Sequence, residues 1–378
     1  MNHPYTNLPA DRFWRTGVAD LDPLKIAGLW QPKFPIGPEA KISTAGSCFA
    51  QHFSRALVAR GYGWCDFEMS PPGLSAQLAH DFNYGVFSFR TGNIYTPKML
   101  RQWLEWAFGD VDVPQECWEM EGRFYDPFRP AIEPRGFASA AEVALSRQTT
   151  LAAIRNAVQH SDVFVFTMGL TESWANVENG VEYAVCPGTI AGQFDAAAHV
   201  FVNHAYGALL DDLNAAMAIL RSENSSLQVL LTVSPVPLTA TASGAHVLTA
   251  TSLSKSILRA VAHAACEGRV DVDYFPSYEI ITSPAYRGRF FAPNLRQVLP
   301  EGVDHVMASF FADQAAQFGA AKPAPTKPAP ANPAPANPAP AKPAFAAPPE
   351  QSDAEAEELA CEEAILNAFA PSHETKVP

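Results

Sequence analysis

The feature that most constrains this sequence is a repeated alternation between short apolar runs and longer segments of helical periodicity, which ends near residue 314. Such alternation is typical of a parallel sheet whose two faces are both covered by helices. We therefore predict a three-layer α/β domain. The expected strands are 41–45, 162–167, 228–233 and 270–275, and the expected helices are 48–60, 140–160, 206–221, 249–266 and 302–314.

A different composition begins near residue 320, where the sequence repeats KPAPT, KPAPA, NPAPA, NPAPA and KPAFA between Lys322 and Pro349. Proline removes backbone donors and fixes φ, so this tract favours an extended polyproline-like spacer of roughly 80 Å. We predict a folded domain over residues 1–318, a linker over 319–350 and an acidic tail over 351–378.

The acidic tail allows two interpretations. Ser352, with Glu355 three residues later, has the pattern of a capping box. One face of the helix that would follow is roughly shared by Leu359, Ile365, Leu366 and Phe369. Such a helix could dock in the groove of a protein partner. The alternative is a frayed acidic tail.

Charge and composition exclude several classes of function. The chain has 378 residues and a formal net charge of -13, which disfavours binding to nucleic acid. It contains no apolar stretch long enough to span a bilayer and no visible secretory signal. Its six cysteines form no CxxC pair, so we expect reduced thiols, a cytoplasmic location and no metal site. No nucleotide-binding or zinc-protease motif occurs, so no cofactor is expected.

Ser47 is the strongest candidate for a catalytic side chain. It follows the first predicted strand and Gly46, at the carboxyl edge where parallel sheets bind ligands. At a helix N-terminus its hydroxyl would face free amides that favour an oxyanion. The alternative is a helix cap, a common role for serine, and Cys48 is a rival nucleophile or a packing residue.

The second strand ends in a Gly-Leu-Thr-Glu string that adds further candidates. Gly169 could supply an amide to the same oxyanion, and Thr171 a hydroxyl donor. Glu172 could hold this loop in place or act as an acid or base. Ser252 to Lys255 matches the SxxK string of penicillin-recognising enzymes, but the companion SDN and KTG strings are absent.

These residues resemble the GSCFA family, whose name is the string that stands here at 46–50. The resemblance covers roughly residues 1–318. It extends to GLTE with Trp174, CPGT at 186–189, TVSPVP at 232–237, SKS at 254–256 and FPSYEI at 275–280.

The family is similar to the SGNH or GDSL hydrolases, so the resemblance implies a flavodoxin-like fold and the cleavage or transfer of acyl esters. It places Ser47 at the nucleophile, and Gly169 and Thr171 at the oxyanion hole. Where those enzymes carry a DxxH string, this chain has Asn294 and Gln297, and glutamine does not titrate near neutral pH.

His305, eight residues after Gln297, is the remaining candidate for the base. Our leading hypothesis is a serine esterase or acyltransferase acting on an acylated carbohydrate or similar small ester. The alternative is a catalytically degenerate module that binds a glycan or protein and recruits a partner through its C-terminal tail.

Aromatic and basic residues suggest where a sugar would bind. The segment 123–130 combines rings with Arg123 and Arg129, which suits a sugar surface or a structural lid braced by Asp126. Four tryptophans could line a carbohydrate groove or fill a core: Trp103, Trp106, Trp118 and Trp174.

Overall fold

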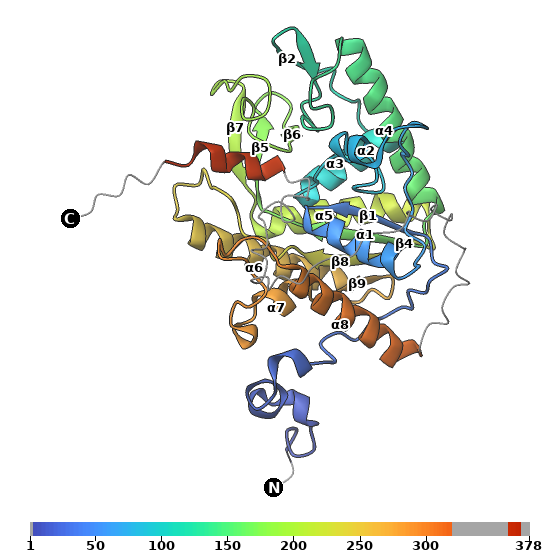
Figure 1. The fold of residues 1–378 in the computed structure, drawn as a ribbon, viewed down its shortest axis with the longest axis vertical. Helices are drawn as coiled ribbons and strands as arrows, with labels where there is room; N and C mark the ends of the chain where they lie inside the picture. The colour runs from blue at the N-terminus through green and yellow to red at the C-terminus, as the bar shows by residue number, and fades with distance from the viewer. Residues whose placement is uncertain (1–2, 320–361, 372–378) are drawn as a thin grey trace, which may run out of the picture.

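The computed structural model describes residues 3–319 and 362–371, and its centre is a parallel sheet lying between two layers of helices (Figure 1). Neighbouring strands pair in the order β1-β4-β8-β9, and every pairing in this sheet is parallel. The predicted α/β class is therefore confirmed. The four strands are β1 (Ile42–Gly46), β4 (Val163–Met168), β8 (Gln228–Val233) and β9 (Val272–Tyr274).

Helices cover both faces of this sheet, as the alternating pattern predicts. One layer contains α1 (Phe49–Ala59), α7 (Ser277–Thr282) and α8 (Pro300–Phe318). The other contains α3 (Pro97–Phe108), α4 (Ala140–His160), α5 (Tyr206–Glu223) and α6 (Val247–Cys266).

Strand β4 shows why the sheet needs both layers. Val163 and Val165 belong to the core beneath α1 and α8, whereas Phe164, Phe166 and Met168 belong to the core beneath α3 to α6. All five side chains are almost completely buried. Since full burial of such a side chain contributes about 1.5–3 kcal/mol, a strand exposed on either face would lose much of its stability.

A smaller antiparallel sheet, which the sequence analysis did not predict, stands beside the carboxyl ends of the central strands (Figure 1). Its strand order is β6-β5-β7. Only three residues separate the end of β4 from the start of β5, and this short connection fixes the small sheet over that edge. Its strands are β5 (Glu172–Asn176), β6 (Glu182–Tyr183) and β7 (His199–Asn203).

The stretch 63–135 packs on the sheet through α3, where Trp103 and Trp106 are buried in the core. It also contains α2 (Ala76–Asp81) and the hairpin β2 (Trp118–Met120) and β3 (Arg123–Tyr125). Short 3-10 helices lie at Ala10–Arg12, Pro23–Lys25, Pro284–Tyr286 and Glu362–Phe369, and a π-helix at Arg15–Ala19.

The predicted linker, apart from Gly319, lies outside the described residues, as do Ser352 and Glu355 of the predicted cap. The described part of the tail, residues 362–371, is called the C-terminal segment below. Within 3–319 and 362–371, no helix is long and apolar enough to cross a bilayer.

Candidate functional site

The turn at the end of β1 depends on glycine. Gly46 has φ of 134°, and a Cβ there would lie 2.3 Å from the carbonyl oxygen of Thr167 on the neighbouring strand. No other residue type fits such a close approach without moving the backbone. The Ser47 amide then donates to the same Thr167 carbonyl at 2.9 Å, which holds Ser47 at the carboxyl edge of the sheet.

Ser47 lies directly against Gly169, as predicted from the two strand ends. A Cβ added to Gly169 would lie 3.0 Å from the Ser47 Cβ. The Ser47 side chain is 2% exposed, and its hydroxyl has no hydrogen-bond partner among the described residues. Helix α1 is capped at Cys48, without a side-chain bond, so the hydroxyl of Ser47 does not act as a helix cap.

The predicted oxyanion donors are engaged elsewhere in this structure. The Gly169 amide donates to the Tyr95 carbonyl at 2.8 Å. The hydroxyl of Thr171 donates to Asn203 Oδ1 at 2.8 Å, and its amide donates to Ser254 Oγ at 3.0 Å. An oxyanion beside Ser47 would therefore need the Tyr95 segment to move away from Gly169.

The loop after β4 is braced from below by α6. Lys255 is only 1% exposed, and its ammonium group donates to the Gly169 carbonyl at 2.6 Å. Together with Ser254, it gives the SKS string a structural role at the site. Neither the family string at 254–256 nor the penicillin-recognising pattern predicted these contacts.

Glu172 lies in the wall of a cavity. Its carboxylate accepts from the Thr241 hydroxyl at 2.8 Å. Burial raises the pKa of Glu172, and the hydrogen bond from Thr241 opposes that shift. Glu172 begins β5, and its raised pKa leaves both predicted roles open, that of holding the loop in place and that of an acid or base.

His305 packs against two aromatic rings. Its ring lies 5.4 Å from Tyr286 and 5.2 Å from Phe290, measured between centroids. Burial lowers the pKa of His305, and the nearby Arg289 lowers it further while Glu301 opposes the shift. The ring of His305 packs on this aromatic pair, and no described hydrogen bond joins it to Ser47.

The stretch that stands in place of DxxH does reach the carboxyl edge. Asn294 Oδ1 accepts from the amides of Arg296 and Gln297 at 3.1 and 3.0 Å. Arg296 Nε donates to the carbonyl of Pro237, just beyond β8, at 3.2 Å. The stretch thus lies near the edge where the DxxH string of the similar hydrolases is expected, but the side chain of Asn294 closes a turn there.

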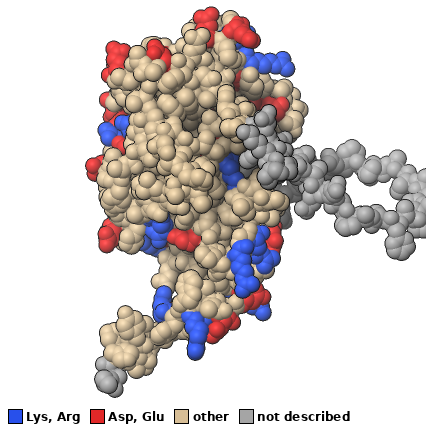
Figure 2. Space-filling view, turned by 90° about the vertical axis from the view of Figure 1, so that its left-hand side faces the viewer, with Lys and Arg blue, Asp and Glu red and all other residues tan. Residues whose placement is uncertain are grey.

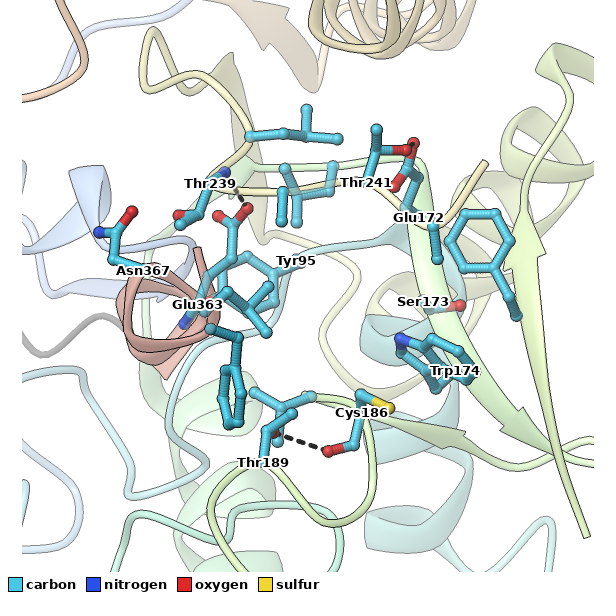
Figure 3. Close-up of a pocket in the computed structure, with 18 of the residues that line it drawn as sticks. Tyr95, Glu172, Ser173, Trp174, Cys186, Thr189, Thr239, Thr241, Glu363 and Asn367 are labelled. Atoms are coloured by element: carbon cyan, nitrogen blue, oxygen red, sulfur yellow. Dashed lines mark hydrogen bonds between the residues drawn. The ribbon is translucent and has the colours of Figure 1, made fainter. Parts of the chain in front are cut away.

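A cavity of about 480 Å³ opens beside these residues (Figure 3). Its walls come from the loop after β4, the small antiparallel sheet, the loop after β8 and the C-terminal segment. Ser47 is not part of the lining. The side chains that matter for ligand chemistry are Tyr95, Glu172, Ser173, Trp174, Phe201 and Leu238.

An imidazole and a carboxylate lie under one wall of this cavity. The place of His204 after Asn203 favours an exposed side chain, with a pocket residue as the alternative, whereas no sequence signal predicts Glu182. His204 Nε2 contacts the Glu182 carboxylate closely and lies 3.4 Å from Ser173 Oγ. Thr96 donates to the same Glu182 at 3.1 Å. Because one nitrogen serves both Glu182 and Ser173, this group lacks the two-sided histidine of a catalytic triad.

Most of the residues considered for a sugar surface are structural. Asp126 and Arg129 are buried and paired at 2.8 Å, and Arg147 pairs with the same carboxylate at 2.8 Å. This is the predicted brace. Trp103, Trp106 and Trp118 lie in the core, whereas Trp174 lines the cavity.

Metal-binding chemistry finds no support in the described residues. Within them, no group of three or more His, Cys, Asp or Glu side chains is arranged to hold a metal ion.

Cys48, the rival nucleophile, is 4% exposed.

Comparison with known families matches residues 41–310 to the GSCFA family, which is well over half of the chain. The same comparison with curated proteins and with solved structures finds no match.

Proposed function

Because this chain belongs to the GSCFA family, we propose that it is a binding member of that family, which holds an amphipathic small molecule such as an acylated sugar in the carboxyl-edge cavity. The observation that carries the proposal is the cavity of about 480 Å³ at the edge where parallel sheets bind ligands. We place this binding in the cytoplasm, where the cysteines of the described residues would stay reduced.

The lining of the cavity suits a ligand with an apolar part and a polar part. Trp174 and Phe201 offer aromatic rings, on which the apolar face of a sugar or an acyl chain can pack. Glu172 and Ser173 add hydrogen-bonding groups to the lining. Figure 2 shows that the middle of the face turned toward the viewer carries few charged side chains, which suits an amphipathic ligand.

Binding is favoured over catalysis by the state of Ser47. The Ser47 hydroxyl makes no hydrogen bond to a described base, and the amides of Ser47 and Gly169 both donate to backbone carbonyls. A serine without a proton acceptor attacks slowly. Asn294 and Gln297 supply no titrating group in place of the acid and base.

Ester cleavage or acyl transfer by Ser47 is a second candidate, supported by one observation. A buried hydroxyl without a partner is unusual, and here it faces Gly169 at the carboxyl end of β1 and β4. Movement of the Tyr95 segment would free the Gly169 amide, which would then point toward the same region.

Calorimetric titration with n-octyl β-D-glucoside tests the binding proposal. We expect saturable binding to the wild-type chain, weakened about tenfold or more by Trp174→Ala. Trp14→Ala is the matched control, because Trp14 is 69% exposed and far from the cavity lining. Absence of saturable binding, or equal affinity in Trp174→Ala, would rule the proposal out.

Hydrolysis of p-nitrophenyl acetate separates the two candidates. Equal rates for wild type and Ser47→Ala support the binding function. A wild-type rate that Ser47→Ala abolishes would establish the esterase instead.

A further inference from the structure

The C-terminal segment lies across the cavity rather than projecting away from the domain. Its 3-10 helix, Glu362–Phe369, is drawn in red beside the small antiparallel sheet in Figure 1. Figure 3 shows Glu363 and Asn367 beside Tyr95 and Thr239. Glu363, Leu366 and Phe369 belong to the cavity lining, so the segment forms part of its wall.

Glu362 is held by a polar cradle of the domain. Its Oε2 accepts from both the backbone amide and the side-chain amide of Asn93, each at 3.1 Å. Gly92 leaves room for the other oxygen, because a Cβ at Gly92 would lie 2.3 Å from Glu362 Oε1. Any side chain at Gly92 would therefore collide with this carboxylate.

Glu363 is held by two further parts of the chain. Its Oε1 accepts from the Thr239 amide at 2.6 Å, and its Oε2 accepts from the guanidinium of Arg296 at 3.2 Å. The amide of Glu363 donates to the Tyr95 hydroxyl at 3.2 Å. Each acidic residue is about 8% exposed, and burial of carboxylates to this extent is stable only with such donors.

The same contacts reach toward the candidate nucleophile. Asn93 precedes Ile94, whose amide donates to the Gly46 carbonyl at 2.9 Å, and the Tyr95 carbonyl accepts from the Gly169 amide. Through Asn93 and Tyr95, the segment therefore fixes the stretch that occupies the Gly169 amide. A docked segment keeps this edge of the sheet closed.

We propose that residues 362–371 are an internal ligand of this site, and that the external ligand they exclude carries a carboxylate bound by Thr239 and Arg296, the donors that hold Glu363. This inference rests on the proposed binding function and specifies the polar end of the ligand: an amphipathic sugar acid or a similar carboxylate. Since residues 320–361 tether the segment to α8, its binding is intramolecular, and an external ligand must compete with a high effective concentration.

The reactivity of one thiol tests whether the carboxylates hold the segment in place. Cys186 lines the cavity, and burial raises its pKa to about 11. Cys266 serves as an internal reference, because burial also raises its pKa to about 11. It is not part of the cavity lining, and its backbone carbonyl accepts from the ammonium group of Lys33. Alkylation by iodoacetamide, resolved by peptide mass spectrometry, reports both cysteines in one sample.

In the full chain with Glu362→Gln and Glu363→Gln, we expect Cys186 to react at least threefold faster relative to Cys266. Asp11→Asn with Asp20→Asn, two exposed changes in the N-terminal part of the chain, is the charge-matched control and should leave the ratio unchanged. An unchanged ratio in the double variant would overturn the proposal that these carboxylates close the site.

A matched pair of amphiphiles tests the chemical class of the ligand. In the double variant we expect n-octyl β-D-glucuronide to bind at least tenfold more tightly than n-octyl β-D-glucoside, because only the former carries a carboxylate. Adding Arg296→Ala should remove most of this preference, and adding Arg221→Ala, at an exposed ion pair with Asp271, should not. Equal affinities in the double variant would overturn the carboxylate assignment.

These outcomes separate the two proposals. The Cys186 measurement contains no sugar. Faster alkylation of Cys186 in the double variant, without any binding of octyl glucoside, would count against the proposed function alone. Binding of octyl glucoside, with an unchanged alkylation ratio in the double variant, would count against the internal ligand alone.

Discussion

The ammonium group of Lys255 donates to the Gly169 carbonyl at 2.6 Å, with its side chain only 1% exposed. This contact joins α6 to the loop that carries the candidate oxyanion residue. A buried lysine is costly unless it is hydrogen-bonded, so the contact ties the shape of the loop to the stability of the fold.

Lys255→Met should lower the free energy of unfolding by about 1.5–3 kcal/mol, the usual range for a hydrogen bond to a charged group. Urea unfolding followed by circular dichroism gives this value. Lys25→Met is the control, since Lys25 is exposed, and it should change stability by less than about 0.5 kcal/mol. A Lys255→Met protein as stable as wild type would show that the contact contributes nothing.

Gly46→Ala should destabilise the fold by about 3 kcal/mol or more, or prevent folding, because the new Cβ would meet the Thr167 backbone at 2.3 Å. Gly28→Ala controls for the left-handed backbone alone. Gly28 has φ of 69° and no atom within 4 Å of a Cβ, so its substitution should cost about 1 kcal/mol. Equal costs at the two positions would contradict the close approach of β1 and β4.

Asp126→Asn should cost about 3–5 kcal/mol at pH 7, since it leaves Arg129 and Arg147 without their buried partner. Burial alone would raise the pKa of Asp126, but the two guanidinium groups together outweigh burial and hold it below its usual range. The carboxylate therefore stabilises the fold above the unfolded pKa of about 3.9, and that contribution is lost as pH falls through the lower folded value.

The pH dependence provides the check on this assignment. Urea unfolding between pH 7 and pH 3 should show the gap between wild type and Asp126→Asn narrowing only at the acidic end. A gap that is constant across this range would contradict a lowered pKa.

His305→Phe should leave any hydrolysis of p-nitrophenyl acetate unchanged, because His305 packs between Tyr286 and Phe290 rather than against Ser47. It should also alter the response of stability to acid. The folded pKa of His305 lies below the unfolded value of about 6.5, so protonation favours the unfolded chain as pH falls. Wild type should lose stability between pH 7 and pH 5 that the variant retains. A large loss of hydrolysis in the variant would restore His305 as the base.

The order of the main elements could be predicted because their signals are local. Helix α4 has the predicted bounds, Ala140–His160, and Ser139 accepts from the Glu142 amide at its start, as in a capping box. Strand β9 is shorter than the predicted 270–275 because Val270 is 82% exposed and lies outside the sheet. Apolarity alone does not show where pairing ends.

The site could be predicted only in part, because most of its contacts join residues that are far apart in the sequence. Ser47 and Gly169 meet because both follow neighbouring parallel strands, a rule that topology supplies. The pairing of Glu362 with Asn93 joins residues 269 positions apart, and no periodicity records such a contact. The aromatic shell of His305 comes from the preceding turn, which the helical pattern of α8 does not reveal.

The covalent attachment of the C-terminal segment bears on how this protein should be handled in the laboratory. A version cut after α8 and the full-length chain present two different receptors to a compound library, one with an unfilled acid-binding cradle and one already supplied with its own glutamates. Compounds that bind this cradle in the shortened version will bind more weakly to the intact protein. The ratio of the two affinities measures how strongly the C-terminal segment binds to its own domain.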